Sequence, residues 1–387
     1  MAAATTSSPL NLLDFNRKPI FPCKLSSPRC RPTLLMPPGG VSSNSIAGTG
    51  RTLSNPPSYM STCLVIPPPP KFQKPKAIIK FIGGAFIGAV PEVTYSYLLE
   101  MLAVEGYLII CVPYNVTFDH AEITRRVSER FTSCLDSILC SGLPDLGLSA
   151  LEVSDLPLYS VGHSNGALLQ TLTESYFSER IPKANVIISY NNRPASEAVP
   201  YFKQLGLVVS QMLPVLATFP VYSVVEAASG NAWKLLLDTA ETVVPNYDQK
   251  AFGSFMTRFT DQLPLIINEL AEGISEFKPT PLENLKSIRE LYNVQSTLLV
   301  KFDSDTIDET DQLEETLRPR IETFGGKLEK AVLSGNHITP CLQELRWEVG
   351  NVYTPADALG QVLKNVSVND TRRLATTIAN WLDRLSH

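Results

Sequence analysis

Short apolar runs alternate with amphipathic stretches along most of this chain. Five runs rich in branched and aromatic residues predict buried strands, at 77–82, 107–112, 158–161, 186–190 and 296–302, and residues 327–333 form a last plausible strand. Apolar residues at helical spacing predict helices at 95–105, at 121–140, directly after residue 164 and at 368–385. Strands that are apolar throughout are buried on both faces, so this order predicts an α/β fold with a mostly parallel, doubly wound sheet.

The strand pattern stops between residues 194 and 286, where the sequence indicates helices separated by Pro and Gly. An all-helical segment of this length between two strands favours a lid over a pocket. A packed structural excursion is an equally weighted alternative. The predicted organisation is therefore an α/β core of residues 64–193 and 287–387, with a helical lid or cap insertion at 194–286.

The first 63 residues differ in composition from the rest of the chain. They are rich in Ser, Pro and Arg, and hold six of the 33 basic residues but only one of the 38 acidic residues, Asp14. This composition, without a continuous apolar segment, is typical of an organellar transit peptide and resembles those of plant chloroplasts. The alternative is a disordered tail. No apolar run reaches the roughly 18 residues of a membrane span, so we expect a soluble protein of the plastid stroma.

The remaining residues are acidic, with 27 basic and 37 acidic side chains, which argues against a nucleic-acid surface. The seven cysteines include no C-x-x-C pair and have no His partner at metal-ligand spacing. Neither a disulfide framework nor a metal site is therefore predicted, and no cofactor is expected. Nothing in the sequence indicates an oligomeric state.

The segment Gly162-His163-Ser164-Asn165-Gly166 lies between a predicted strand and a predicted helix. In this context the Gly-x-Ser-x-Gly pattern predicts a nucleophile elbow, in which the Ser takes a strained backbone conformation and the glycines let strand and helix approach closely. Ser164 is therefore the candidate nucleophile. The same pattern also occurs in ordinary Gly-rich turns, so the presence of a base and an acid decides between the two interpretations.

A serine hydroxyl needs a base that takes its proton and a carboxylate that orients the base. The chain has four histidines. His163 lies inside the elbow, where its side chain cannot return to the Ser164 hydroxyl, and His387 is the last residue. His120 precedes a long predicted helix, where Asp119 or His120 could be a cap or lie near a pocket mouth. The predicted base is His337, on a Gly-containing loop after the last strand.

The acid is expected on a loop between the nucleophile and the base, in the chain order Ser, Asp, His. Asp303, Asp305 and Asp308 all lie in the loop after the strand at 296–302. Asp305 is the predicted acid, because three residues past the strand are enough to turn back over the sheet edge. Asp303 is the alternative, and Asp308 is interpreted as a cap of the next helix.

Glycines also follow the first predicted strand directly, at Gly83 and Gly84. They let backbone N–H groups turn towards a ligand, as an oxyanion hole or a phosphate cradle requires. The spacing matches neither G-x-G-x-x-G nor the Walker A pattern, which disfavours a nucleotide site.

The elbow, the Gly-rich segment 81–89, the acid loop and Gly335-Asn336-His337 together resemble an α/β-hydrolase. More narrowly, the chain from Phe81 to the histidine loop is similar to the DUF1350 family of plants and cyanobacteria, sometimes labelled esterase-like. This resemblance implies that Ser164 is the nucleophile, Asp305 the orienting acid and His337 the general base.

The same resemblance implies an oxyanion hole formed by the N–H of Asn165 and a second N–H, from Gly84 or Ala85. The chain departs from the pattern of many esterases at this second position. They carry His-Gly-Gly where this sequence has Ile82-Gly83-Gly84.

The hypothesis is a serine hydrolase that cleaves a carboxylic ester or thioester of a small hydrophobic, acyl- or lipid-like substrate through an acyl-enzyme on Ser164. One alternative is an acyltransferase that uses the same triad. The other is a non-catalytic binding or assembly factor that keeps the fold. No nucleic-acid partner and no integral membrane association are expected.

Overall fold

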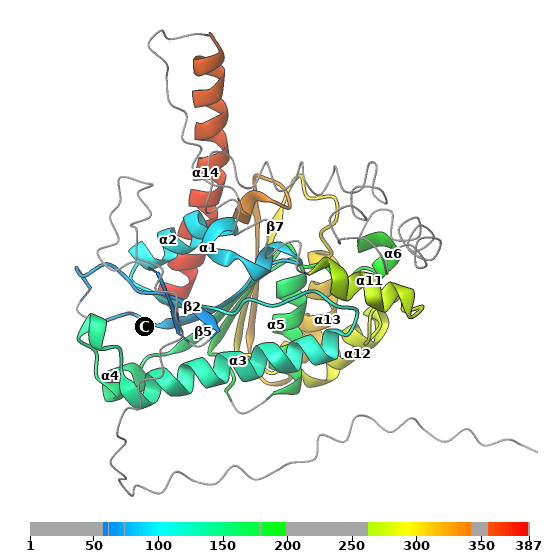
Figure 1. Cartoon of the computed structure of the whole chain (residues 1–387), viewed down its shortest axis with the longest axis horizontal. Coiled ribbons are helices and arrows are strands. Elements are labelled where there is room, and N and C mark those ends of the chain that lie inside the picture. Colours follow the sequence, from blue (N-terminus) through cyan, green and yellow to red (C-terminus); the bar gives the residue numbers. More distant parts are fainter. Residues whose placement is uncertain are drawn as a thin grey trace, which may run out of the picture. The chain divides into compact units, whose positions relative to one another are not determined.

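The computed structural model describes residues 57–60, 62–72, 74–177, 180–198, 262–341 and 355–385, all within one compact unit, Ile46–His387. Within these residues eight strands form one sheet in the order β1-β2-β4-β3-β5-β6-β7-β8 (Figure 1). The strands are β1 (Ser58–Met60), β2 (Cys63–Ile66), β3 (Ile78–Ile82), β4 (Leu108–Cys111), β5 (Leu158–His163), β6 (Ala184–Ile188), β7 (Ser296–Phe302) and β8 (Lys327–Leu333). β2 is antiparallel to both its neighbours, and all pairs from β4 to β8 are parallel.

The parallel register brings the carboxyl ends of the strands to one edge of the sheet. Ile82 at the end of β3 pairs with Gly162 of β5, His163 pairs with Ile188 of β6, and Phe302 of β7 pairs with Leu333 of β8. The loops that follow β3, β5, β7 and β8 therefore all begin at this edge, where α/β sheets bind their ligands.

Helices cover both faces of the sheet (Figure 1). The side chains of one face pack with α1 (Pro91–Thr94), α2 (Ser96–Val104) and the end of α14 (Pro355–Arg384). The opposite face packs with α3 (His120–Ser141), α4 (Ala150–Ser154), α5 (Asn165–Tyr176), α12 (Pro281–Leu291) and α13 (Thr310–Thr323). A mostly parallel sheet with two covered faces and an elbow after β5 is the α/β-hydrolase fold, so the predicted fold class is confirmed.

α3 shows how the local sequence sets an element of this fold. The Asp119 side chain accepts a hydrogen bond from the Glu122 N–H at 2.8 Å, so Asp119, of the two residues considered as a cap, has the capping role. Its buried positions repeat at helical spacing, and Gly142 ends the helix with a φ of 70°.

The boundary predicted for the N-terminal segment is wrong at its C-terminal end. Residues 1–56 and 61 lie outside the described residues, but Ser58–Met60 form an edge strand that pairs with β2. β1 has three residues, too few to show an alternating pattern, and the apolar run of β2 directly follows the Ser- and Pro-rich segment.

The boundary predicted for the insertion at residue 286 is also wrong, because it cuts through α12. Thr280 and Glu283 form a capping box at the start of this helix, and Ile288 is fully buried against the core. α12 is therefore a core helix. Of the rest of the insertion the structure describes α6 (Ala195–Ala198), α11 (Leu263–Ala271) and the turn after it, and residues 199–261 lie outside the described part.

Among the described residues, no helix combines the length and the apolar character that crossing a membrane would require. The cysteines that the structure describes are all free, and Cys111 is fully buried in the core.

Candidate active site

The nucleophile elbow lies at the junction of β5 and α5. Ser164 has a φ of 56°, a conformation that a non-glycine residue takes only at a cost in strain. The flanking glycines are required by close backbone approaches: a Cβ on Gly166 would lie 2.1 Å from the Gly83 carbonyl oxygen, and one on Gly162 would lie 2.9 Å from the Ala167 Cα. The predicted strand, turn and helix are thus present around Ser164.

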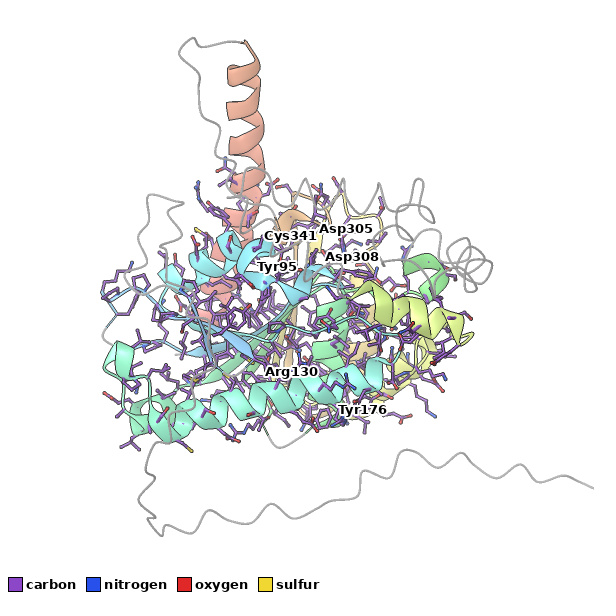
Figure 2. The ribbon with its side chains drawn as sticks, viewed as in Figure 1. Tyr95, Arg130, Tyr176, Asp305, Asp308 and Cys341 are labelled. Carbon is purple, nitrogen blue, oxygen red and sulfur yellow. The ribbon has the colours of Figure 1, made fainter. Side chains whose placement is uncertain are left out.

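Three of the sheet-edge loops bring their polar side chains into one hydrogen-bonded chain. The Ser164 hydroxyl donates to Nε2 of His337 at 2.8 Å, and Nδ1–H of His337 donates to Oδ2 of Asp305 at 2.8 Å. A carboxylate only accepts, so this geometry fixes the His337 tautomer that can take the serine proton. Asp305 lies in the loop that follows β7 (Figure 2).

The environment of Asp305 favours its charged form. Its side chain has no exposed surface, and burial alone would raise the pKa of the carboxyl. The hydrogen bond and the charge of His337, together with the hydrogen bond from the Ile307 N–H, outweigh burial and hold the pKa below its ordinary value. Asp303, the alternative acid, instead accepts hydrogen bonds from the Ser304 hydroxyl and the Gly335 N–H.

The oxyanion donors were predicted from Asn165, Gly84 and Ala85. The Gly84 N–H already donates to the Tyr95 hydroxyl oxygen at 2.7 Å, which disfavours Gly84 among the two alternatives for the second donor. In the part of the chain that the structure describes, the N–H groups of Asn165 and Ala85 have no hydrogen-bond partner. The loop that carries Ala85 lies against the nucleophile, because a Cβ on Gly84 would lie 3.3 Å from the Ser164 Cβ. Asn165 and Ala85 are therefore the predicted donors whose N–H groups remain free for a ligand.

The Asn165 side chain is held from two sides by residues that the sequence did not single out for this role. The Tyr114 hydroxyl donates to Oδ1 of Asn165 at 3.0 Å, and Nδ2 of Asn165 donates to Nε2 of His120 at 3.1 Å. The buried His120 ring stacks on Phe277, with 4.2 Å between ring centroids. Tyr114 follows the end of β4, so its place at the sheet edge was the available signal.

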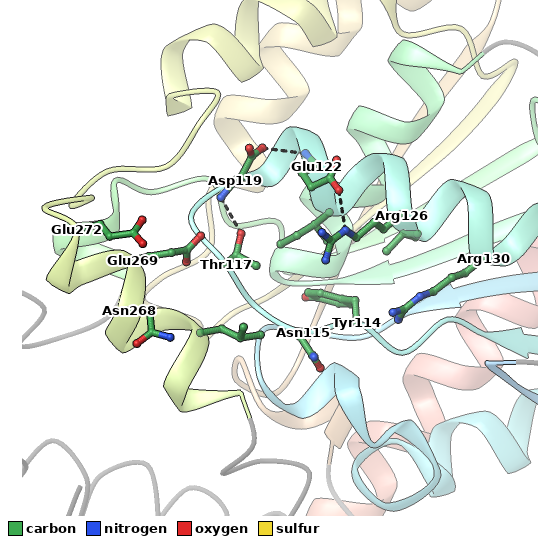
Figure 3. A pocket seen from close by; sticks show the side chains of 13 residues that line it. Tyr114, Asn115, Thr117, Asp119, Glu122, Arg126, Arg130, Asn268, Glu269 and Glu272 are labelled. Atoms are coloured by element: carbon green, nitrogen blue, oxygen red, sulfur yellow. Dashed lines mark hydrogen bonds and ion pairs between the residues drawn. The ribbon is translucent and has the colours of Figure 1, made fainter. Parts of the chain in front are cut away.

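A cavity of about 390 Å³ lies beside this support, between α3, α11 and the loop after β4 (Figure 3). Tyr114 lines it, whereas the three triad side chains do not. Most of the residues that line it are polar or charged, with Arg126 and Arg130 on α3 and Glu269 and Glu272 at α11. Within the described ranges, no group of three or more His, Cys, Asp or Glu side chains is placed to hold a metal ion.

Two buried histidines near the nucleophile make the free energy of unfolding of the protein depend on pH in the acid range. Burial lowers the pKa of His163 to about 3 and that of His120 to about 4, against about 6.5 in the unfolded chain. Below about pH 6.5 the unfolded chain binds protons that the folded chain does not, so stability falls as pH falls, until the folded pKa is reached. Each histidine contributes a slope of about 1.4 kcal/mol per pH unit in this window.

We expect His120→Gln, which keeps an acceptor for Asn165, to reduce the slope of unfolding free energy against pH by about 1.4 kcal/mol per unit between pH 6.5 and 4. Urea unfolding of the wild type and the variant at several pH values measures this difference. Equal slopes for the two proteins would show that His120 is not kept neutral by burial.

A comparison of the sequence with models of known protein families finds one match. Residues 62–384 match the family described as "Protein of unknown function (DUF1350)". No curated protein matches the sequence.

Several solved structures resemble the chain. A "Lipase (Open form)" shares 16% identity, with 81% of this chain and 94% of that chain covered and a TM-score of 0.37. The Pyrococcus furiosus esterase Pf2001 shares 14%, with 84% and 86% covered and a TM-score of 0.39. MenH from S. aureus shares 12%, with 81% and 100% covered and a TM-score of 0.40. Likeness at this level does not bear on activity.

Proposed function

The chain belongs to the DUF1350 family, and we propose that it is a serine hydrolase that cleaves carboxylic esters or thioesters through an acyl-enzyme on Ser164. The observation that carries this proposal is the hydrogen-bonded chain from Ser164 through His337 to Asp305, with both links at 2.8 Å. Ser164 lies in a strained elbow and is only partly buried.

In the proposed reaction, the Ser164 hydroxyl oxygen attacks the carbonyl carbon while its proton moves to Nε2 of His337. The ionised Asp305 stabilises the imidazolium that forms. The N–H groups of Asn165 and Ala85 stabilise the negative charge on the former carbonyl oxygen. His337 then gives its proton to the leaving alcohol or thiol, and a water activated by the same base releases the acid.

Labelling with a fluorophosphonate probe tests the proposal, because the probe reacts with an activated serine whatever the natural substrate is. We expect the wild type to be labelled and Ser164→Ala to be unlabelled. Ser175→Ala is the matched control, since Ser175 lies on the same helix and its hydroxyl donates to the Thr171 carbonyl oxygen. Absence of labelling in folded wild type would favour a non-catalytic binding or assembly factor.

The substrate class rests on the sequence. The apolar segments within residues 194–286, which the sequence predicts to be helical, support a hydrophobic acyl group, and the composition of residues 1–63 supports a plastid address for the mature protein. Hydrolysis and acyl transfer are separated by product analysis in the presence of an added alcohol: a new ester indicates transfer, and free acid alone indicates hydrolysis.

A further inference from the structure

His163, the residue before the nucleophile, has a defined partner for each of its ring nitrogens. The side chain is only 1% exposed at the end of β5. Its Nε2 lies 2.9 Å from the carbonyl oxygen of His337, and its Nδ1 lies 2.7 Å from the Tyr95 hydroxyl. A carbonyl only accepts, so Nε2 carries the proton of a neutral ring and Nδ1 accepts from the Tyr95 hydroxyl.

The hydrogen bonds continue from Tyr95 to the loop after β3. The Tyr95 hydroxyl donates to His163 and accepts from the Gly84 N–H at 2.7 Å, so every donor in the series has an acceptor. The Tyr95 ring also makes an edge contact with the His163 ring, with 5.7 Å between centroids. One buried series therefore joins the oxyanion loop (residues 83–86), the elbow and the loop that carries His337.

The bond to His337 is made to the backbone of the general base itself. Its carbonyl oxygen is two covalent bonds from the Cα that carries the imidazole, so a shift of this carbonyl moves the ring between Ser164 and Asp305. A displacement of about 1 Å in such a group can cost on the order of a hundredfold in rate. A histidine that only filled space in the core would have no such effect.

We propose that His163 is a positioning residue, which holds the backbone of His337 and, through Tyr95, the Gly84 backbone in register with Ser164. This inference rests on the proposed function, because it assigns His163 to the same reaction. His163 is also suited to lie beside an imidazolium: burial lowers its pKa to about 3, so it stays neutral while the His337 ring, 5.1 Å away between centroids, takes up a proton.

Two substitutions at position 163 separate positioning from packing. The Gln in His163→Gln places an amide N–H near the position of Nε2 and can still donate to the His337 carbonyl. The Asn in His163→Asn is too short to reach that carbonyl, but its Oδ1 can still accept from Tyr95. With p-nitrophenyl butyrate we expect His163→Asn to lower kcat about 10- to 100-fold with KM within about twofold, and His163→Gln to stay within about threefold of wild type.

A pair of tyrosines supplies the matched control. Tyr95→Phe removes the hydroxyl at the centre of the series. The loss of kcat that it causes should therefore be smaller in the His163→Asn background than in the wild type. Tyr107→Phe also removes a hydroxyl hydrogen bond, to Asp383 at 2.7 Å, but at the start of β4, away from the three loops. We expect Tyr107→Phe to lower Tm with kcat unchanged.

Fluorophosphonate labelling rates, kcat, KM and Tm of these variants decide the question. Wild-type kcat in His163→Asn, or equal losses in the Asn and Gln variants, would overturn the positioning role. A folded wild type that neither turns over the ester nor reacts with the probe would overturn the proposed function, and the inference with it.

Discussion

Ser164→Ala and His337→Ala are each expected to lower kcat for a p-nitrophenyl ester about 10⁶-fold, with KM little changed. The two side chains act as one unit, because the hydroxyl is a nucleophile only while Nε2 of His337 accepts its proton at 2.8 Å. The double variant should therefore be no slower than either single variant. A loss of this size corresponds to about 8 kcal/mol of transition-state stabilisation.

Asp305→Asn should cost less, about 10⁴-fold in kcat. The asparagine amide can donate to Nδ1 of His337, which favours the tautomer with its proton on Nε2 and removes the acceptor from Ser164. Asp303→Asn is the control, because Asp303 lies in the same loop but contacts Ser304 and Gly335 instead. Measurements of kcat and KM for each variant with the same p-nitrophenyl ester provide the test.

A Ser164→Ala variant whose kcat lies within tenfold of the wild-type value would exclude the acyl-enzyme mechanism.

The meeting of Ser164, His337 and Asp305 could be predicted because each follows a predicted strand: β5 and β7 have strong apolar patterns, and β8 has a weaker one. β7 and β8 have the predicted bounds, and β5 begins where predicted. Once the strands are parallel, their following loops share one edge, and residue chemistry selects the side chains. The hydrogen bonds that join them support the roles assigned to them, which stay predictions until the kinetics are measured.

The supporting residues could not be predicted, because their contacts depend on packing between distant segments. Tyr95 fits the apolar pattern of a helix start, and nothing in the neighbouring sequence indicates that its hydroxyl oxygen would accept a hydrogen bond from the Gly84 N–H. The His163 side chain cannot return to the Ser164 hydroxyl, so the sequence predicts no catalytic role for it, although its ring contacts the backbone of His337, 174 residues away. Local sequence shows residue type and face, whereas these bonds depend on the tertiary fold.

The buried ion pair between Lys80 and Glu174 is another such feature, and it carries the largest expected effect on stability. Lys80 interrupts the apolar run of β3, and Glu174 lies on α5; their side chains are 4% and 1% exposed and 2.5 Å apart. The Ser160 hydroxyl donates to the same carboxylate oxygen, and the Lys80 ammonium lies 5.5 Å from the centre of the Phe131 ring. The pair thus joins the strand before the oxyanion loop to the helix after the nucleophile.

Lys80→Met is expected to lower the free energy of unfolding by about 3–5 kcal/mol at pH 7, because it leaves the Glu174 carboxylate buried without its partner. Burial already raises the Glu174 pKa, against the opposing effect of Lys80. Without Lys80 this pKa rises further, so the folded variant gains a proton before the unfolded chain does. The deficit of Lys80→Met relative to wild type should therefore shrink as pH falls from 7 to 5.

Two further variants make this prediction specific to the pair. Lys80→Met with Glu174→Met removes both charges, and it should recover most of the loss, since an apolar pair of similar volume can replace a buried ion pair. Lys76→Met removes the exposed Lys76–Asp383 ion pair, whose side chains are 36% and 40% exposed, and should cost less than about 1 kcal/mol. Urea unfolding of the four proteins measures these differences. If the double variant is as unstable as Lys80→Met alone, the loss comes from packing around Lys80 and not from an unpaired carboxylate.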